Sequence, residues 1–533
     1  MMAVEEPTTH VNNWPNAAGF GDLEDTITPI SLDIAGKIPS YVHGSLFRTG
    51  PGSYTVPLTN QPGQCFKVYH WFDGFAQFHK FDVSPPSPVC PNGRVMYRSK
   101  SGSDALKAEI DKHNGSPVTT SFAYRDPCKT KFAKFFTKFD RSDDVTARNI
   151  SVTINPKFPS TMSGDSELVV KTDANQLLRL NNETLEPEER FNWSAMKSDD
   201  IEKALLNGPV SAAHSCFDEG IEFNYVLNFG KNMSYTVFSL DRTRTMTIHA
   251  VIPVSRAVYI HSFFLTKKYI VLCLWQANFK YRGLSVLWNR NALDSIDRTW
   301  SPNSNTEWIV IPRDGSARHD NSKIKVFKSD PFFCFHTINA YDDGDDIVLD
   351  LSQYKDHGIL WDLTVEALRS DTATGVFDPD EAPRYTRWRL PSVSTTTKHG
   401  VAVLEAQSAQ NLDNIELPTI NPAKSLTKQR YVYGINMDGN SSFFDKLIKL
   451  DIDTLETTFW SENACSPSEA LFVADPKGKE EDDGVLLTVV LDGLKNRSML
   501  VILDAKTMNE LCRATMPTDK IVGHGFHGSV LLK

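Results

Sequence analysis

Strand-length apolar runs recur along this 533-residue chain, and no low-complexity linker separates them. They are rich in β-branched and aromatic residues and are bounded by Asp, Asn, Gly or Pro, as strands and turns are. Examples are SELVVKTD, EFNYVLNFG, YIVLCLW, DDIVLDL, RYVYGI, DGVLLTVVLD and SMLVILDA. So many strands in one chain favour an all-β architecture closed radially, which leaves only short, protected edges. Two β-sandwiches are the alternative.

Helical patterns are few, and we expect helices at 101–113, 199–207 and 363–370. The segment 1–25 is expected to be a loosely ordered N-terminal extension. It is acidic and polar at its start and has no apolar h-region, so a secretory signal is not expected. The longest apolar runs are of strand length and too short to span a bilayer. These features predict a cytoplasmic protein that is not secreted.

Composition narrows the possible partners. Lys plus Arg is 56 and Asp plus Glu is 66, for a formal net charge of −10. This balance argues against nucleic acid as a partner, because polyanion binding favours a basic surface. The eight cysteines are scattered singly, without a CxxC pair, so neither a zinc knuckle nor a disulfide scaffold is indicated.

Four histidines lie in separate short contexts: His214 in AAHSCFD, His261 in YIHSFFL, His336 in FCFHTINAYDDGDD and His527 in GFHG. Their spacing excludes a local metal loop, so only the fold could bring them together. Neutral imidazoles suit Fe, Zn, Cu or Ni, although two histidines and one carboxylate are the commoner non-heme iron set. Four histidines without a coordinating carboxylate would leave the metal its full charge and positions open for O2.

Ordered motifs along nearly the whole chain resemble the carotenoid cleavage oxygenase family. They are GSLFRTGPGSY at 44–54, HWFDGFAQFHKF at 70–81, ETLEPEERF at 183–191, FHTINAYDDGDDIVLDL at 335–351, IELPTI at 415–420, EDDGVLLTVVLD at 481–492 and GFHGS at 525–529. The resemblance implies one domain over 1–533: a seven-bladed β-propeller with a helical and loop cap over an axial iron site. It also implies one Fe(2+) per subunit, held by His214, His261, His336 and His527, with O2 as co-substrate. Oligomeric state stays open.

The resemblance also implies acidic residues behind three of the four imidazoles, where they would fix the imidazole tautomer. Glu416 and Glu469 match two of these positions, although either residue alone would more often be a solvated carboxylate. The third usually reads Thr-Glu-x-Asn and here contains Asp173, a shorter acid, so we expect a backbone shift or a water to complete that contact. Thr172 lies where the family places a residue near an open coordination position. His524, three residues before His527, is the alternative ligand.

The implied function is Fe(II)-dependent oxidative cleavage of a C=C bond in a carotenoid or apocarotenoid, giving aldehydes. The motifs are most similar to fungal carotenoid oxygenases, notably the torulene-cleaving group, so the expected substrate is a torulene-like lipophilic polyene. An O2-independent retinoid isomerohydrolase-like enzyme and a stilbene-cleaving dioxygenase are alternatives; the latter would need Lys171 in a phenol-binding role. If the protein is not an enzyme, the alternatives are a carotenoid carrier and a protein-interaction platform.

One segment indicates a membrane or lipid-droplet surface as a further partner. In YRDPCKTKFAKFFTKF at 124–139, a helix would gather Phe132, Phe135, Phe136 and Phe139 on one face, with lysines on the other. The segment resembles the one with which animal family members dock on membranes, in which Cys128 would be the residue that carries a lipid. The alternative is a buried amphipathic helix with snorkelling lysines.

Overall fold

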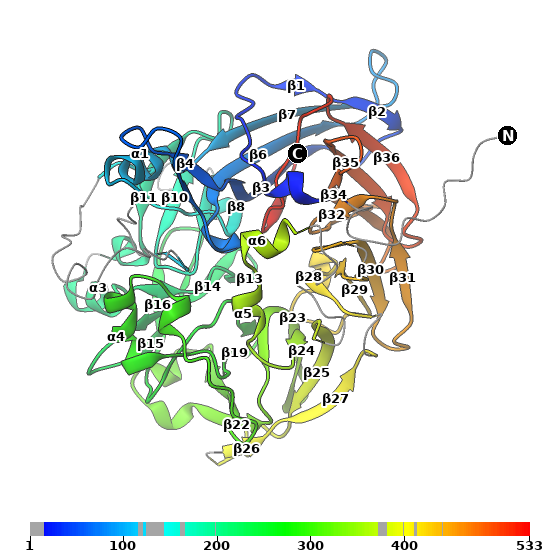
Figure 1. The fold of residues 1–533 in the computed structure, drawn as a ribbon. Coiled ribbons are helices and arrows are strands. Elements are labelled where there is room, and N and C mark those ends of the chain that lie inside the picture. The colour runs from blue at the N-terminus through cyan, green and yellow to red at the C-terminus, as the bar shows by residue number, and fades with distance from the viewer. Residues whose placement is uncertain are drawn as a thin grey trace.

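The computed structural model describes residues 15–115, 121–123, 143–159, 166–197, 199–370, 381–397, 399–409, 413–439 and 441–533. Within these ranges the strand-length runs form seven largely antiparallel sheets of four to six strands each. The sheets stand side by side as blades around one axis (Figure 1). The expected seven-bladed propeller is therefore confirmed, and the two-sandwich alternative is excluded.

Blades 1 to 4 follow one another along the chain. Blade 1 consists of β1 (Ile30–Ser31), β7 (Arg94–Ser101), β6 (Phe75–Ser84), β3 (Gly44–Ser53) and β37 (Gly528–Leu532). Blade 2 consists of β11 (Pro187–Phe191), β10 (Leu177–Leu180), β9 (Ser166–Lys171) and β8 (Thr153–Pro159). Blade 3 consists of β12 (Val210–Ser211), β13 (Cys216–Asp218), β14 (Ile221–Asn228), β15 (Ser234–Leu240) and β16 (Met246–Pro253). Blade 4 consists of β18 (Phe264–Leu265), β19 (Tyr269–Leu274), β21 (Thr306–Pro312), β22 (Lys325–Ser329) and β26 (His399–Val401).

Blades 5 to 7 complete the ring. Blade 5 consists of β23 (Phe333–Asp343), β24 (Asp346–Tyr354), β25 (Arg384–Leu390) and β27 (Val403–Gln407). Blade 6 consists of β28 (Glu416–Thr419), β29 (Tyr431–Asn436), β30 (Lys446–Asp451) and β31 (Thr457–Trp460). Blade 7 consists of β2 (Asp33–Gly36), β36 (Glu510–Thr515), β35 (Arg497–Asp504), β34 (Gly484–Asp492), β32 (Cys465–Pro467) and β33 (Leu471–Ala474). Two short pairs lie outside the blades: β4 (Thr55–Pro57) with β5 (Cys65–Lys67), and β17 (Ala257–Val258) with β20 (Asn278–Phe279).

Strands from opposite ends of the chain close the ring twice. β37 pairs with β3 and so adds a C-terminal strand to the N-terminal blade. β2 pairs with β36 and adds an N-terminal strand to blade 7. Each exchange covers a sheet edge that would otherwise be open, which protects the propeller against edge-to-edge association.

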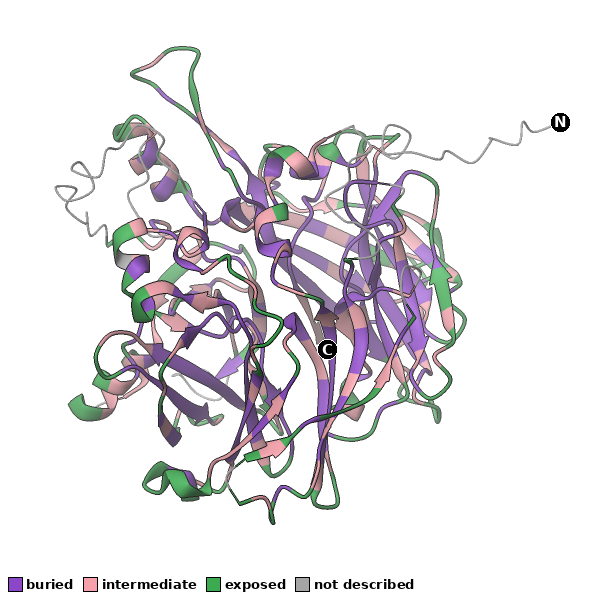
Figure 2. Ribbon diagram, turned by 60° about the horizontal axis from the view of Figure 1, so that its bottom comes forward, coloured by how far each residue is buried: buried purple, intermediate pink, exposed green. Residues whose placement is uncertain are grey.

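Large side chains fill the wedges between blades. Trp308 of blade 4 lies with its ring centroid 5.8 Å from that of Trp388 of blade 5, and Phe332 stacks on Trp388 at 5.7 Å. All three are nearly excluded from solvent. Figure 2 shows that the blade strands are mostly buried, while exposed residues gather in the loops between them. Such aromatic pairs add to the stabilisation from apolar burial, so the blades hold one another in a fixed order.

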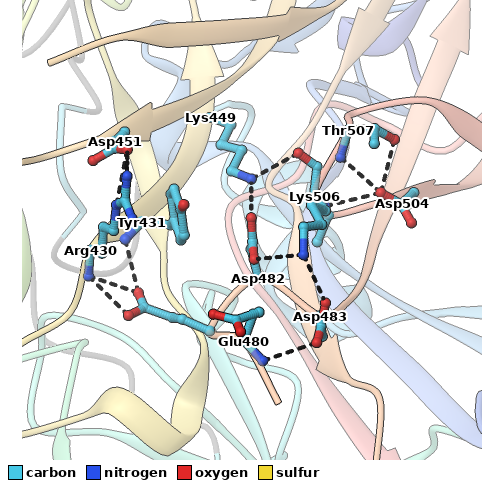
Figure 3. A network of polar contacts seen from close by, with 12 residues as sticks. Arg430, Tyr431, Lys449, Asp451, Glu480, Asp482, Asp483, Asp504, Lys506 and Thr507 are labelled. Carbon is cyan, nitrogen blue, oxygen red and sulfur yellow. Dashed lines mark hydrogen bonds and ion pairs between the residues drawn. The ribbon is translucent and has the colours of Figure 1, made fainter. Parts of the chain in front are cut away.

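A buried ion pair joins blade 6 to blade 7 (Figure 3). Lys449 of β30 donates from Nζ to Asp482 Oδ2 at 2.7 Å and to the Lys506 carbonyl at 2.9 Å. The side chains of Lys449 and Asp482 are only 8% and 6% exposed, and the ammonium lies over the ring of Tyr431. Because both charges are almost desolvated, each is tolerated only in the presence of the other.

Helices are short and cover one face of the ring. The expected helices are present but shorter, as α1 (Asp104–Lys112), α3 (Asp200–Leu205) and α6 (Val365–Leu368). Two more are α4 (Leu284–Asn289) and α5 (Ile359–Asp362), and α5 and α6 lie over the middle of the ring in Figure 1. None of the helices in the described ranges is long and apolar enough to cross a membrane.

The part of the N-terminal segment that the structure describes, 15–25, is packed rather than loose. Ala17–Phe20 forms a 3-10 turn, and the Phe20 ring contacts those of Phe443 and His524 at centroid distances of 5.2 and 4.7 Å. Phe20 is fully buried, so burial of this one aromatic ring fixes the segment against the propeller. The expectation of looseness fails for these residues because it rested on the polar start of the chain alone.

Candidate metal centre

The seven blades meet around a cluster of four histidines. His527 immediately precedes β37, His214 lies between β12 and β13, His261 lies just before β18, and His336 is in β23. One ring nitrogen from each lies within 4.8 Å of the corresponding nitrogen of every other. The Nε2 atom of His527 is 2.9 Å from Nε2 of His214 and 3.2 Å from Nε2 of His336. The fold thus brings together all four histidines singled out in the sequence, and four converging imidazole nitrogens could hold a metal ion.

Carboxylates stand behind three of the four imidazoles. Nδ1 of His527 lies 2.8 Å from Glu469 Oε1, and Nδ1 of His336 lies 2.5 Å from Glu416 Oε2. Each carboxylate also accepts a backbone N–H: Gly528 donates to Glu469, and Leu417 donates to Glu416. An acceptor at Nδ1 places the proton there and leaves Nε2 free to bind a metal.

Asp173 completes the third contact directly. Both of its carboxylate oxygens lie 2.9 Å from Nδ1 of His261, so neither the backbone shift nor the bridging water expected for the shorter acid is needed for the contact. The Tyr259 hydroxyl donates to Asp173 Oδ2 at 2.8 Å and lies 3.3 Å from the same imidazole nitrogen. Tyr259 therefore holds the shorter carboxylate in place. Sequence reasoning missed this residue, although it stands only two positions before His261.

His214 has no carboxylate contact among the described residues, and its turn is held instead by polar side chains of blades 2 and 3. Asn224 accepts from the Ala212 N–H at 3.1 Å and donates to the Ala212 carbonyl at 3.0 Å. Ser215 Oγ accepts from Asn224 at 2.8 Å and from Lys171 Nζ at 2.7 Å. These bonds bracket His214 on both sides along the chain and fix its backbone.

Lys171 also forms a buried ion pair with Glu222, so its ammonium faces away from the cavity. This orientation does not suit the phenol-binding role that the stilbene alternative would require.

Electrostatics favours neutral imidazoles at His214 and His527 and ionised carboxylates at Glu416 and Glu469. Burial, together with the neighbouring imidazoles and Lys171, holds the pKa of His214 well below its usual value. Burial also lowers the pKa of His527. Although burial opposes their ionisation, the imidazole partners and backbone N–H groups hold the pKa values of Glu416 and Glu469 below the usual range for glutamate. Neutral nitrogen donors are the form that a metal ion requires.

His524 does not join the cluster. It is buried, its Nε2 lies 3.2 Å from the Asn16 carbonyl, and its backbone carbonyl accepts a hydrogen bond from Trp71. Burial lowers its pKa to about 4. The alternative ligand assignment is thus not supported by geometry, since His524 packs against the N-terminal segment.

A cavity of about 310 Å³ lies against the histidine cluster. His261, His336, His527 and Thr172 line it, while α1, α4 and α5 contribute apolar residues from the cap. Its walls are largely aromatic: the Phe72 ring lies 4.9, 5.7 and 5.8 Å from those of Phe122, Phe335 and Phe526. A mostly apolar pocket ending at the cluster suits an elongated lipophilic molecule.

The residues predicted to dock on a membrane lie outside the described part of the chain. They are Cys128, Phe132, Phe135, Phe136 and Phe139. The described stretch just before them, 121–123, contributes Ser121 and Phe122 to the cavity lining. The segment 124–139 therefore comes directly after residues that line the cavity.

Comparison with known proteins agrees with this fold. Residues 21–529 match the family described as retinal pigment epithelial membrane protein. The chain is 31% identical to a carotenoid dioxygenase of Neurospora crassa, over 98% of this chain and 92% of that protein. It is 33% identical to a torulene dioxygenase of Fusarium fujikuroi, over 97% and 93% of the two chains.

Solved structures support the same architecture. A mutant of the Synechocystis apocarotenoid oxygenase superposes with a TM-score of 0.75 at 20% identity, covering 99% of this chain and all of that one. The cobalt-substituted form of that protein gives a TM-score of 0.71 at the same identity. With the family match over nearly the full length, the chain belongs to the carotenoid oxygenase family, which also includes the retinal pigment epithelial membrane proteins.

Proposed function

We propose that this protein is an iron-dependent dioxygenase that cleaves a C=C bond of a carotenoid or apocarotenoid. The observation that carries the proposal is the convergence of four imidazole nitrogens, three of them from residues that line an aromatic cavity. The curated relatives named above as carotenoid and torulene dioxygenases support the same reaction class. Addition of both atoms of O2 across the cleaved double bond gives two carbonyl products, which balances the reaction.

His214, His261, His336 and His527 would hold the iron. The donor set fits a ferrous ion because it offers four imidazole nitrogens and because three imidazoles are oriented through Nδ1 by Asp173, Glu416 and Glu469. Bound there, Fe(2+) would supply the binding and activation of O2.

The protein itself would position the substrate and keep water away from the reacting bond. Aromatic rings such as Phe72, Phe335 and Phe526 would hold the polyene in one register and exclude water from the reacting bond. Thr172 lines the cavity and directly precedes Asp173, which contacts His261. We propose that its side chain restricts access to an open coordination position, so that small O2 enters while a larger ligand does not.

We also propose that the segment 124–139 docks the protein on a membrane or lipid-droplet surface. A carotenoid partitions into lipid, and the residues before this segment line the cavity. A peripheral position at the cavity mouth would let the substrate pass from lipid to iron without crossing water.

The deciding experiment combines metal analysis with oxygen uptake. Purified protein is loaded with Fe(2+) and given a torulene-like carotenoid or an apocarotenal in detergent micelles, in air and under argon. We expect one iron per chain, one O2 consumed per double bond cleaved, and aldehyde products that carry 18O when 18O2 is supplied. Turnover of a retinyl ester under argon would support the isomerohydrolase alternative, and pigment binding without turnover would support a carrier. His336→Ala serves as the metal-free control.

A further inference from the structure

Three polar side chains of the cavity lining come from one part of the chain. Thr172, Gln176 and Arg148 all line the cavity and come from blade 2 or from the loop that leads into it. Strand register places them at one end of that blade, because Lys171 is the partner both of Thr153 in β8 and of Leu177 in β10. The lining also includes Asp73, Asp173 and Glu416, whose carboxylates accept hydrogen bonds from the fold. Most of the other lining residues are aromatic or aliphatic.

Arg148 is the only positively charged side chain among the lining residues that the structure describes. It is partly buried, and its one hydrogen bond runs from Nη1 to the carbonyl of the adjacent Ala147 at 3.0 Å. A guanidinium has five N–H donors, so most of its donor capacity is not used by the described residues. Within the described ranges Arg148 forms no ion pair, although the chain has ten more acidic than basic residues.

The surroundings of Arg148 add a cost to its charge. Burial and the nearby Arg190 both lower its pKa. A partly desolvated cation beside a second cation is unfavourable unless an anion or a strong acceptor neutralises it. An anion or a strong acceptor could approach Arg148 from the cavity.

The two neighbouring amide side chains differ in whether they already form hydrogen bonds within the fold. Asn149 donates to the Gly74 carbonyl at 2.8 Å and accepts from the Ala76 N–H at 2.9 Å, so its amide is occupied by the fold. The side-chain amide of Gln176 makes no hydrogen bond within the described part of the chain, and it lines the same cavity. Gln176 can therefore supply a second donor to a group that approaches Arg148.

We propose that Arg148, assisted by Gln176, binds a terminal carboxylate of the substrate, so that the preferred substrate is an apocarotenoid acid rather than a hydrocarbon carotenoid. This inference rests on the proposed function and narrows its substrate class. Arginine forms two parallel hydrogen bonds with a carboxylate, which gives both affinity and direction. Anchoring one end of a rigid polyene also fixes which double bond lies at the histidine cluster.

The test compares an apocarotenoid acid with its methyl ester, because the two differ only in the end group. For the wild-type protein we expect a lower KM for the acid. Arg148→Gln should lower kcat/KM for the acid by about 10- to 100-fold, mainly through KM, since a hydrogen bond to a charged group is lost. The ester cannot form the ion pair and should lose far less. Arg190→Gln is the matched control, because Arg190 lies near Arg148 but does not line the cavity.

Binding gives a readout that does not need turnover. Quenching of tryptophan fluorescence by the bound polyene, with Trp71 in the cavity wall, reports the affinity of each variant for acid and ester. Equal losses for acid and ester in Arg148→Gln, or a wild-type preference for the ester, would overturn the inference. If wild-type protein binds the acid through Arg148 but cleaves neither compound in air with iron bound, the proposed function fails while this subsite stands.

Discussion

Asp173 lies 2.9 Å from Nδ1 of His261 through either carboxylate oxygen, and the same carboxylate accepts the hydroxyl proton of Tyr259. A shorter acid thus reaches the imidazole without help from water, and a tyrosine keeps it there. The two neighbours act as one unit, since the hydrogen bond from Tyr259 limits the rotation of the Asp173 side chain.

Tyr259→Phe should weaken iron binding by roughly 10-fold, within the range seen when the partner of a ligating histidine is lost. The reason is that Asp173 would lose the donor that fixes its orientation toward His261. Competition against a chelator measures the affinity. Tyr433→Phe is the control, because that buried hydroxyl bonds to the Ala505 carbonyl and contacts none of the four histidines. Equal iron affinity in both variants would contradict the role given to Tyr259.

Ser215→Ala should also lower iron affinity, by about 10-fold, although Ser215 contacts no proposed ligand side chain. The hydroxyl accepts from Lys171 and Asn224 and so fixes the turn that carries His214, the histidine without a carboxylate contact in the described structure. The absorption spectrum of the Co(2+)-loaded protein should shift as the fourth nitrogen moves. Ser239→Ala, in the same blade but bonded to His249, should leave both readouts unchanged. An unaltered spectrum in Ser215→Ala would mean that the backbone alone holds the turn.

The sequence contexts predicted the four histidines, Glu416 and Glu469 because each lies in a motif of its own, and the fold brings them together. Asp173 could be placed from the motif around it, but the geometry of its contact could not, because it depends on a tyrosine 86 residues away in the chain. Ser215 and Asn224 were missed since a hydroxyl and an amide in a turn carry no pattern until the turn is known. Arg148 was missed for the same reason, because only the packed cavity shows that it lacks an acidic partner.

Asp73 should make stability depend on pH. Burial raises the pKa of its carboxyl to about 7, although the N–H groups of Phe122 and Ala123 donate to it. The folded state therefore holds a proton that the unfolded chain releases near pH 4, so the contribution of this proton to stability is full below pH 4 and is lost as pH rises to 7. Relative to Asp73→Asn, the wild type should lose on the order of 4 kcal/mol over this interval. Urea unfolding of both proteins at several pH values measures the difference, and parallel curves would refute it.

Lys449→Met should destabilise the propeller by about 3–5 kcal/mol, because it removes the cation that lies 2.7 Å from the buried carboxylate of Asp482 and leaves only Lys506, at 4.0 Å. The unfolding midpoint in urea should fall accordingly. Lys428→Met provides the comparison, since Lys428 is exposed and its side chain pairs with Asp453 at the surface. Similar midpoints for the two variants would show that the junction of blades 6 and 7 does not depend on the buried pair.

Replacing Phe135 and Phe136 with Ser should release the protein from liposomes and leave its iron content unchanged. The reason is that these rings belong to the apolar face predicted for 124–139, which would lie in the membrane interface. Co-sedimentation with vesicles measures binding. Replacing Phe459, an exposed aromatic residue of blade 6, with Ser is the control. Undiminished sedimentation of the double variant would favour the buried amphipathic helix instead.

The centre draws one residue from, or next to, each of the seven blades: four histidines from blades 1, 3, 4 and 5, and three acids from blades 2, 6 and 7. A growing polypeptide on the ribosome therefore has no complete set of donors until His527 has been made and β37 has docked beside β3. The four-histidine site is therefore complete only once the strand that follows His527 has closed the ring, so binding of a metal by all four imidazoles would report that closure.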